Sequence, residues 1–169
     1  MGHIVGAALV SHHPGLMQCE EFRRLMGNGE DSDLIPGYAR LRDKIAAAQP
    51  DVVLVFDSHW FTTGYHLVDG AARYTGSYIS DEMPWYLHGV PYDYRGHPEL
   101  ALAIEAVSRE QGGYNRVINH PELGKQYATI NLVDTIRSTN GVGDAKLFGP
   151  QDYSMRVWLQ TDRMTGRTP

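Results

Sequence analysis

The sequence predicts an α/β fold, with an open, mostly parallel sheet, helices on both faces, and a C-terminal helix and β-hairpin. Two short apolar runs, at residues 3–10 and 51–56, each end abruptly in polar residues that include histidine. Between them lies a stretch with helical periodicity. Strand, helix and strand in this order predict a βαβ unit, whose two strands should be parallel.

The second apolar run is short and rich in β-branched residues, which is typical of a strand covered on both faces. It continues into Asp57, Ser58, His59 and Trp60. Because ligands of open α/β sheets bind beyond the carboxyl ends of the strands, His59 is predicted to lie where chemistry takes place.

The first apolar run, residues 3–10, is followed by His12, His13 and a Pro-Gly pair that stops regular structure. It predicts a first strand that ends in histidines. If it runs parallel to the second strand, His12 or His13 meets His59 at one edge of the sheet. The loop at residues 16–36 is expected to wrap over this site.

Two helices are predicted from apolar residues at three- and four-residue spacing, at residues 37–49 and 98–110. Pro98 suits the first turn of the second helix. The proline- and aromatic-rich residues 83–94 predict loops with aromatic walls, and residues 115–118 a short strand.

Composition and charge exclude several classes of protein. The chain has 169 residues, of which 42% are hydrophobic and 21% charged, as in ordinary globular proteins. A net charge of -5 without a basic cluster argues against nucleic-acid and membrane partners. No stretch is long enough to span a membrane. The single cysteine, Cys19, excludes a disulfide scaffold, and residues 1–10 lack the basic start of a signal peptide, so a cytoplasmic location is expected.

Eight histidines exceed what a chain of this size needs for packing. Two histidines and a carboxylate with open positions are the arrangement that non-haem Fe(II) oxygenases use. Lone histidines are more often hydrogen-bonded structural residues, so the residues alone leave both interpretations open.

Several ordered motifs resemble the class III (LigB-type) extradiol ring-cleavage dioxygenases, within them most closely the homoprotocatechuate 2,3-dioxygenase branch. They stand at residues 7–14, 55–60, 64–66, 78–84 and 92–100, so the likeness covers about residues 2–124. The resemblance implies a doubly wound, here truncated, LigB-like α/β fold. It also implies a ferrous iron held by two histidines and a glutamate, and extradiol cleavage of a catechol-type aromatic with O₂.

The resemblance carries the two histidine ligands over to His12, in its Ser-His-x-Pro motif, and His59, in its Asp-Ser-His-Trp motif. His13 occupies a variable position and is not carried over. The family's glutamate ligand lies later in a full-length chain, and nothing after Lys125 resembles that region.

Other residues around this site remain open to two interpretations. An acid–base group must move protons in such a reaction, and His66 and His120 are the candidates. Asp57 either orients a ligand imidazole or caps the strand end. Trp60, Trp85, Tyr86 and Tyr92 either wall an aromatic pocket or simply pack.

Residues 127–164 resemble instead a periplasmic porter-subdomain segment of resistance-nodulation-division efflux pumps. The apolar spacing of Ile130, Val133 and Ile136 predicts a helix, and alternation along residues 153–159 predicts one strand of a hairpin. Two domains are therefore expected, a partial dioxygenase domain at residues 1–125 and an extension at residues 126–169. Fusion to a foreign piece and truncation with a coincidental tail both remain open.

The sequence thus predicts Fe(II)-dependent extradiol cleavage, incomplete because one ligand is missing. The alternative is an inactive subunit, or fold relic, that binds metal or catechol beside an intact partner. A homo-oligomer or a pairing with another subunit is expected. An efflux-pump function for the whole chain fails for lack of a membrane span.

Overall fold

The computed structural model describes residues 2–57, 59, 62, 64–120, 124–137 and 155–160. The chain forms two compact units, Met1–Pro50 with Tyr127–Tyr153 (unit 1) and Asp51–Gln126 with Ser154–Pro169 (unit 2). Each unit takes residues from both sides of the boundary predicted at residue 125. The different origin of residues 126–169 stays a prediction.

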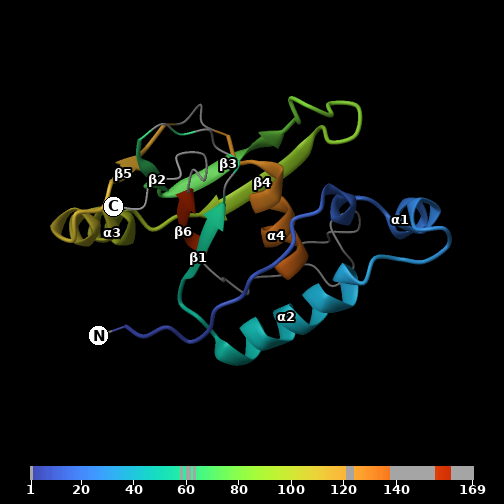
Figure 1. The fold of residues 1–169 in the computed structure, drawn as a ribbon, viewed down its shortest axis with the longest axis horizontal. Helices are drawn as coiled ribbons and strands as arrows, with labels where there is room; N and C mark the ends of the chain where they lie inside the picture. The colour runs from blue at the N-terminus through green and yellow to red at the C-terminus, as the bar shows by residue number, and fades with distance from the viewer. Residues whose placement is uncertain are drawn as a thin grey trace. The chain divides into compact units, whose positions relative to one another are not determined.

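Unit 1 is helical in the part that the structure describes (Figure 1). It contains the 3₁₀ helix η1 (Pro14–Met17) and the α-helices α1 (Glu20–Met26), α2 (Leu34–Ala48) and α4 (Tyr127–Arg137). Leu16 of η1 and Tyr38 of α2 form its buried core, against which Leu132 of α4 packs. The predicted loop at residues 16–36 therefore contains a helix, α1.

The predicted helix at residues 37–49 is confirmed as α2, which begins three residues earlier. Pro36 lies in the first turn, where its missing N–H leaves no helical hydrogen bond unmade. The helix ends at Ala48, and the next residue, Gln49, adopts the left-handed conformation and donates its N–H to the carbonyl of Ile45 (3.0 Å).

The strand predicted at residues 3–10 is wrong: these residues belong to no helix or sheet. Ile4 and Leu9 are 89% and 102% exposed. An extended apolar segment becomes a strand only where a neighbour pairs with its backbone, and among the described residues no strand pairs with this segment. The βαβ unit predicted around this segment does not form.

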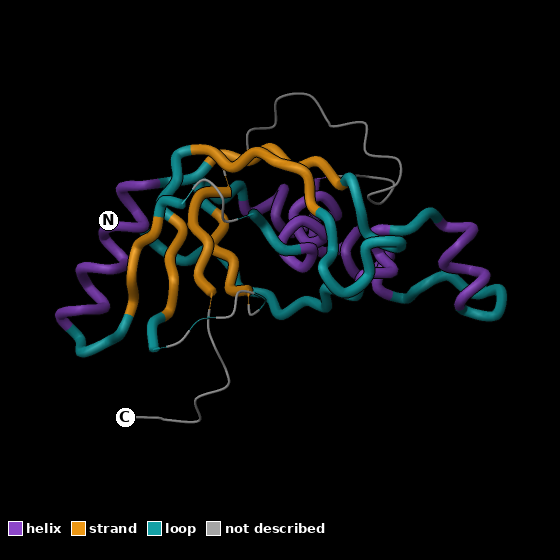
Figure 2. The backbone as a smooth tube through the Cα atoms, turned by 90° about the horizontal axis from the view of Figure 1, so that it is seen from above, coloured by secondary structure: helices purple, strands orange, loops and turns teal. Residues whose placement is uncertain are grey.

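Unit 2 contains a four-stranded sheet in the order β1 (Val53–Asp57), β6 (Met155–Gln160), β2 (His66–Asp69) and β5 (Asn115–Ile118). β1 pairs with β6 in parallel, β2 pairs with β5 in parallel, and β2 joins β6 in antiparallel orientation. The strands lie side by side in Figure 2. The mixed α/β class and the mostly parallel sheet are confirmed.

One face of this sheet is packed by α3 (Pro98–Glu110), the second predicted helix. The His97 side chain accepts the Leu100 N–H and caps the helix, and Pro98 occupies the first turn as predicted. Fully buried Val68 and Ala101 form the core between β2 and α3. The predicted strand at residues 115–118 is confirmed as β5.

The end of the stretch predicted as loops, residues 83–94, lies instead in strand β4 (Val90–Arg95), which pairs in antiparallel orientation with β3 (Arg73–Tyr78). Tyr74 and Tyr94 stand opposite each other and are both buried. Cross-strand aromatic pairs stabilise such a ribbon. Pro91 is tolerated because each strand of a two-stranded sheet has an open edge.

The predicted C-terminal helix and strand are confirmed as α4 and β6. The predicted partner of β6 in a hairpin, at residues 141–149, lies outside the described residues. Both edges of β6 pair with β1 and β2, so β6 is an inner strand of the sheet. Across the described residues, no helix has the length and apolar character needed to cross a membrane.

Candidate metal centre

The Asp57 carboxylate holds the imidazole of His59 where the chain leaves β1. His59 Nδ1 lies 2.6 Å from Asp57 Oδ1, and the same oxygen accepts the His59 backbone N–H at 3.0 Å. Asp57 is 9% and His59 22% exposed at the side chain. One carboxylate oxygen therefore does both things that the sequence left open, capping the strand end and orienting the ring.

This contact decides which nitrogen of His59 could bind a metal ion. A carboxylate accepts hydrogen bonds and does not donate them, so Nδ1 carries the proton. Nε2 is then the nitrogen with a lone pair for a metal. Metal-bound histidines generally donate their other N–H to a carboxylate or a carbonyl, so the pair fits a divalent cation.

His12 lies in unit 1, in the loop before η1, with an exposed side chain. Its ring centroid lies 5.8 Å from that of Tyr127, at an interplanar angle of 56°. Its backbone carbonyl accepts a hydrogen bond from Asn131 Nδ2 at 3.2 Å. The loop that carries His12 is thus held by α4.

His13 performs a structural task next to it. Its Nδ1 accepts the Gly15 N–H at 3.0 Å and so caps the start of η1.

The predicted ligands His12 and His59 belong to different units, and their pairing stays a prediction. Within the described residues, no three His, Cys, Asp or Glu side chains come together as a metal site. The chemistry of the Asp57–His59 pair fits a metal ligand, while the third ligand is not found in this part of the chain.

Strand register separates the two acid–base candidates. Asp57 and Leu67 pair with the same residue of β6, Gln160, so His66 and His59 stand at the same end of the sheet. Ile118 pairs with Asp69 at the other end of β2, so His120 follows β5 at the opposite end. The register favours His66.

Sequence reasoning missed a buried ion pair in unit 2. Lys125 Nζ contacts Asp69 Oδ2, and their side chains are 3% and 7% exposed. The ammonium lies 3.9 Å from the centroid of the Tyr74 ring. The only sequence signal is an acid at the end of an apolar strand, and nothing in it indicates a partner 56 residues away.

Of the four aromatic residues predicted to wall a pocket or to pack, Tyr92 packs against another ring. Tyr92 stacks on Tyr94 at 6.0 Å, and its hydroxyl accepts the Lys125 N–H at 3.3 Å. Trp85 is 77% exposed, and Trp60 lies outside the described residues.

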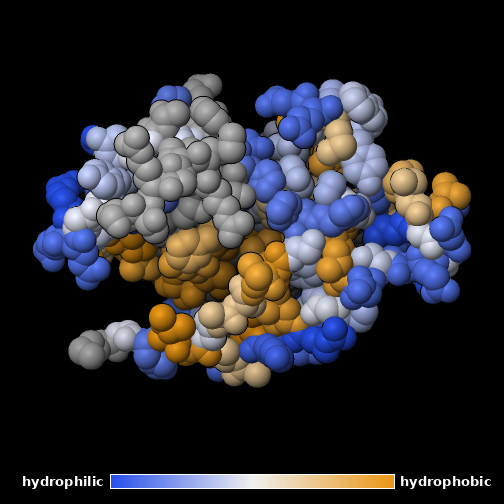
Figure 3. Space-filling view, in the orientation of Figure 1, coloured by the Kyte–Doolittle hydropathy of each residue, from blue (hydrophilic) through white to orange (hydrophobic). Residues whose placement is uncertain are grey.

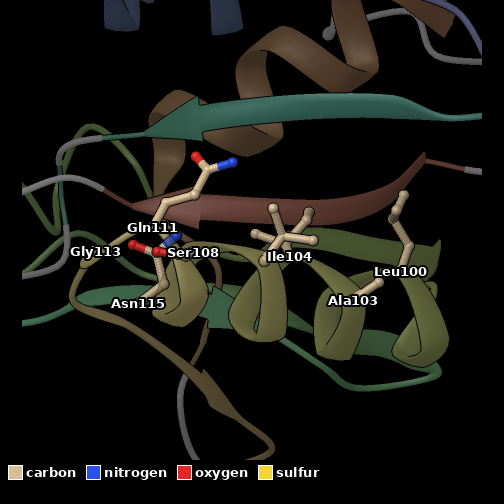
Figure 4. A pocket seen from close by; sticks show the side chains of 8 residues that line it. Leu100, Ala103, Ile104, Ser108, Gln111, Gly113 and Asn115 are labelled. Atoms are coloured by element: carbon tan, nitrogen blue, oxygen red, sulfur yellow. The ribbon is translucent and has the colours of Figure 1, made fainter.

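A separate apolar pocket of about 440 Å³ lies along α3 in unit 2 (Figure 4). Leu100, Ala103 and Ile104 line its apolar length, and Ser108, Gln111 and Asn115 its polar end. Asn115, at the polar end, is the β5 residue that pairs in register with His66.

Comparison with known proteins gives the family. Residues 6–121, about two thirds of the chain, match the family described as the catalytic LigB subunit of aromatic ring-opening dioxygenase. The chain belongs to this family. Both Asp57–His59 and the predicted ligand His12 fall within the matched residues of this LigB-type chain.

Two curated relatives are also named as dioxygenases. The LigB-type chain is 27% identical over 132 residues to 3,4-dihydroxyphenylacetate 2,3-dioxygenase of Escherichia coli, covering 77% of this chain and 46% of the relative. It is 27% identical over 139 residues to the 2-aminophenol 1,6-dioxygenase beta subunit of a Pseudomonas species. This match covers 80% of this chain and 45% of the relative. The chain thus spans less than half the length of these relatives.

A short likeness to a transport protein also exists. The multidrug export protein AcrF of Escherichia coli K12 is 53% identical over 36 residues, which are 21% of this chain and 3% of AcrF. This agrees with the efflux-pump resemblance noted in the sequence, and it is too short a share of AcrF to bear on function.

Proposed function

We propose that this LigB-type chain supplies two histidine ligands, His12 and His59, to an Fe(II) centre for extradiol cleavage of a catechol-type aromatic with O₂. The observation that carries the proposal is the Asp57–His59 pair, 2.6 Å apart at the end of β1 in a LigB-family domain. Bound there, the iron would hold the diol and O₂ together and pass electron density from the ring to oxygen.

Asp57 and His66 have distinct tasks in this proposal. Asp57 holds the His59 ring so that Nε2 faces the metal position. His66 stands at the same end of the sheet, and its Nδ1 is buried without a hydrogen-bond partner among the described residues. We assign the acid–base role to His66, because an imidazole at this end of the sheet could take up a proton and return it later.

The third ligand comes from outside the described part of this chain. In this proposal a second subunit supplies the carboxylate. A relative named as a beta subunit supports pairing between subunits, and a second copy of this chain is the other possible partner. A cytoplasmic location remains part of the proposal.

A second candidate function is a catalytically inactive subunit that binds metal or catechol. The observation that favours it is the lack of a three-residue metal cluster among the described side chains. It predicts binding of Fe(II) or catechol without consumption of oxygen.

The test is an anaerobic Fe(II) titration of the purified chain and of the variants His12→Ala and His59→Ala. We expect one Fe(II) per chain, with binding lost in both variants. Asp57→Asn should weaken binding about 10- to 100-fold, because the amide no longer fixes the His59 tautomer. His88→Ala, which removes an exposed histidine of unit 2, is the matched control.

Oxygen uptake then separates the two candidate functions. The probe is 3,4-dihydroxyphenylacetate, the compound in the name of one relative. Uptake on addition to the Fe(II)-loaded chain supports the dioxygenase, and binding without uptake supports the inactive subunit. Fe(II) binding that is indifferent to both histidine substitutions would overturn the metal centre altogether.

A further inference from the structure

The loop that carries His12 is held by side chains of two helices of unit 1. Its three successive backbone carbonyls, at Ser11, His12 and His13, each accept a side-chain hydrogen bond. The Tyr38 hydroxyl of α2 donates to the Ser11 carbonyl. Asn131 Nδ2 of α4 donates to the carbonyls of His12 (3.2 Å) and His13 (2.8 Å).

These hydrogen bonds take the place of a sheet ladder. Residues 3–13 lie in no helix or strand of the structure, so pairing with a neighbouring strand does not fix their backbone. Backbone carbonyls need donors, and here two helix side chains provide them. Without these donors, the backbone carbonyls of residues 11–13 would lose the side-chain hydrogen bonds that hold them.

Asn131 is suited to this task by its chemistry and its burial. Its amide nitrogen carries two N–H donors, one for each carbonyl. Asn131 is at 0% exposure, as are Ile130 and Val133 of the same helix. A polar side chain buried this deeply costs free energy unless it is hydrogen-bonded, so its contacts hold it in one orientation.

α4 also approaches the His12 side chain, since the Tyr127 ring lies against the imidazole. Both contacts come from a helix that lies outside residues 6–121, the part that matches the LigB family. We propose that Asn131 is a positioning residue for His12: it fixes the backbone of this ligand and so the place from which its imidazole reaches the metal. This inference rests on the proposed function.

The decisive variant is Asn131→Asp, which keeps the size of the side chain and replaces the two donors with acceptors. Tyr38→Phe removes the hydroxyl that donates to the Ser11 carbonyl and keeps the ring in the core. It therefore tests the same group of hydrogen bonds if Asn131→Asp fails to fold. Asn28→Asp makes the same chemical change at an exposed position of unit 1, where φ is 54° and aspartate is tolerated. It is the control.

The first readout needs no metal: the NMR signal of the His12 ring, assigned by its loss in His12→Ala. We expect it to shift and broaden in Asn131→Asp and to shift in Tyr38→Phe, while Asn28→Asp leaves it unchanged. The second readout is anaerobic Fe(II) titration of the same proteins, where Asn131→Asp should bind about tenfold more weakly. A purely structural role would lower the melting temperature alone.

The outcomes separate this inference from the proposed function. An unchanged His12 signal and unchanged Fe(II) affinity in a folded Asn131→Asp variant would overturn the positioning role. A shifted His12 signal, with Fe(II) binding indifferent to both Asn131→Asp and His12→Ala, would support the hold of Asn131 on the His12 backbone and overturn the metal centre. A shifted signal with weakened binding supports both.

Discussion

Lys125 and Asp69 form the most deeply buried ion pair that the structure describes. Asp69 also accepts the Ala71 N–H at 3.2 Å, and its backbone carbonyl accepts the Tyr74 hydroxyl at 3.0 Å. The Tyr74 ring lies against the Lys125 ammonium. Removing one member of such a pair leaves the other charge buried without compensation.

Lys125→Met is therefore expected to destabilise the protein by about 3–5 kcal/mol. Chemical denaturation followed by circular dichroism measures this change. Lys44→Met, at an exposed position of α2, should stay within about 0.5 kcal/mol of the wild type. Adding Asp69→Asn to Lys125→Met should recover part of the loss, because no unpaired charge remains. Equal effects of the two lysine substitutions would contradict the buried pair.

The same pair gives the stability a pH dependence. Burial lowers the pKa of Lys125 below its usual 10.5, and this effect outweighs the attraction of Asp69 and Asp57. Between the lowered folded pKa and 10.5, the unfolded chain holds a proton that the folded chain has released. The contribution of Lys125 to stability therefore rises with pH across this window. The rise should be absent in Lys125→Met.

Among the elements, α3 protects the edge strand β5 as well as packing on the sheet. Among the described strands, β5 pairs with β2 alone, and the Val117 N–H donates to Glu105 Oε2 of α3 at 3.0 Å. The second carboxylate oxygen accepts from Arg109 at 2.7 Å. A charged side chain over an open edge discourages pairing with another chain.

Glu105→Ala should leave the Val117 N–H without its partner and cost about 1–3 kcal/mol. Hydrogen exchange of the Val117 amide measures the effect directly and should become faster. Glu105→Gln retains an acceptor oxygen and should keep most of the protection. Glu110→Ala, on the exposed end of the same helix, is the control, and equal exchange rates in all four proteins would refute the role.

Elements that depend on local pattern could be predicted, and those that depend on distant partners could not. α2 and α3 follow from apolar spacing alone. The predicted strand at residues 3–10 has the right composition, but a strand also needs a neighbour. β4 was missed because its proline and tyrosines indicate a loop until β3 stands opposite them.

The candidate site also contains one contact between near neighbours in the sequence and one that depends on a distant partner. Asp57 and His59 are two residues apart at a strand end, so their contact could be offered from the sequence as one of two interpretations. The hydrogen bond from Asn131 to the His12 carbonyl connects residues more than a hundred positions apart, from segments that resemble different families. No periodicity or motif reports such a contact, and only the folded chain shows it.

At the scale of the whole molecule, the sheet of unit 2 is only partly covered on the face that α3 packs. Phe56 and Val68 pair with the same residue of β6, Leu159, so they share this face. Val68 is fully buried beneath α3, whereas Phe56 and Leu54 of β1 are 64% and 40% exposed. Figure 3 shows apolar surface in the region of β1.

An open apolar strand face of this kind favours association. Burying one large apolar side chain contributes about 1.5–3 kcal/mol, so a contact centred on Phe56 is sensitive to its loss. We expect the purified chain to self-associate and Phe56→Lys to weaken this association by at least about tenfold. Sedimentation velocity over a concentration series measures it. Trp85→Lys removes another exposed aromatic side chain of unit 2 and should leave association unchanged. A wild-type chain that stays monomeric at every soluble concentration, or equal effects of the two substitutions, would show that this face does not mediate association.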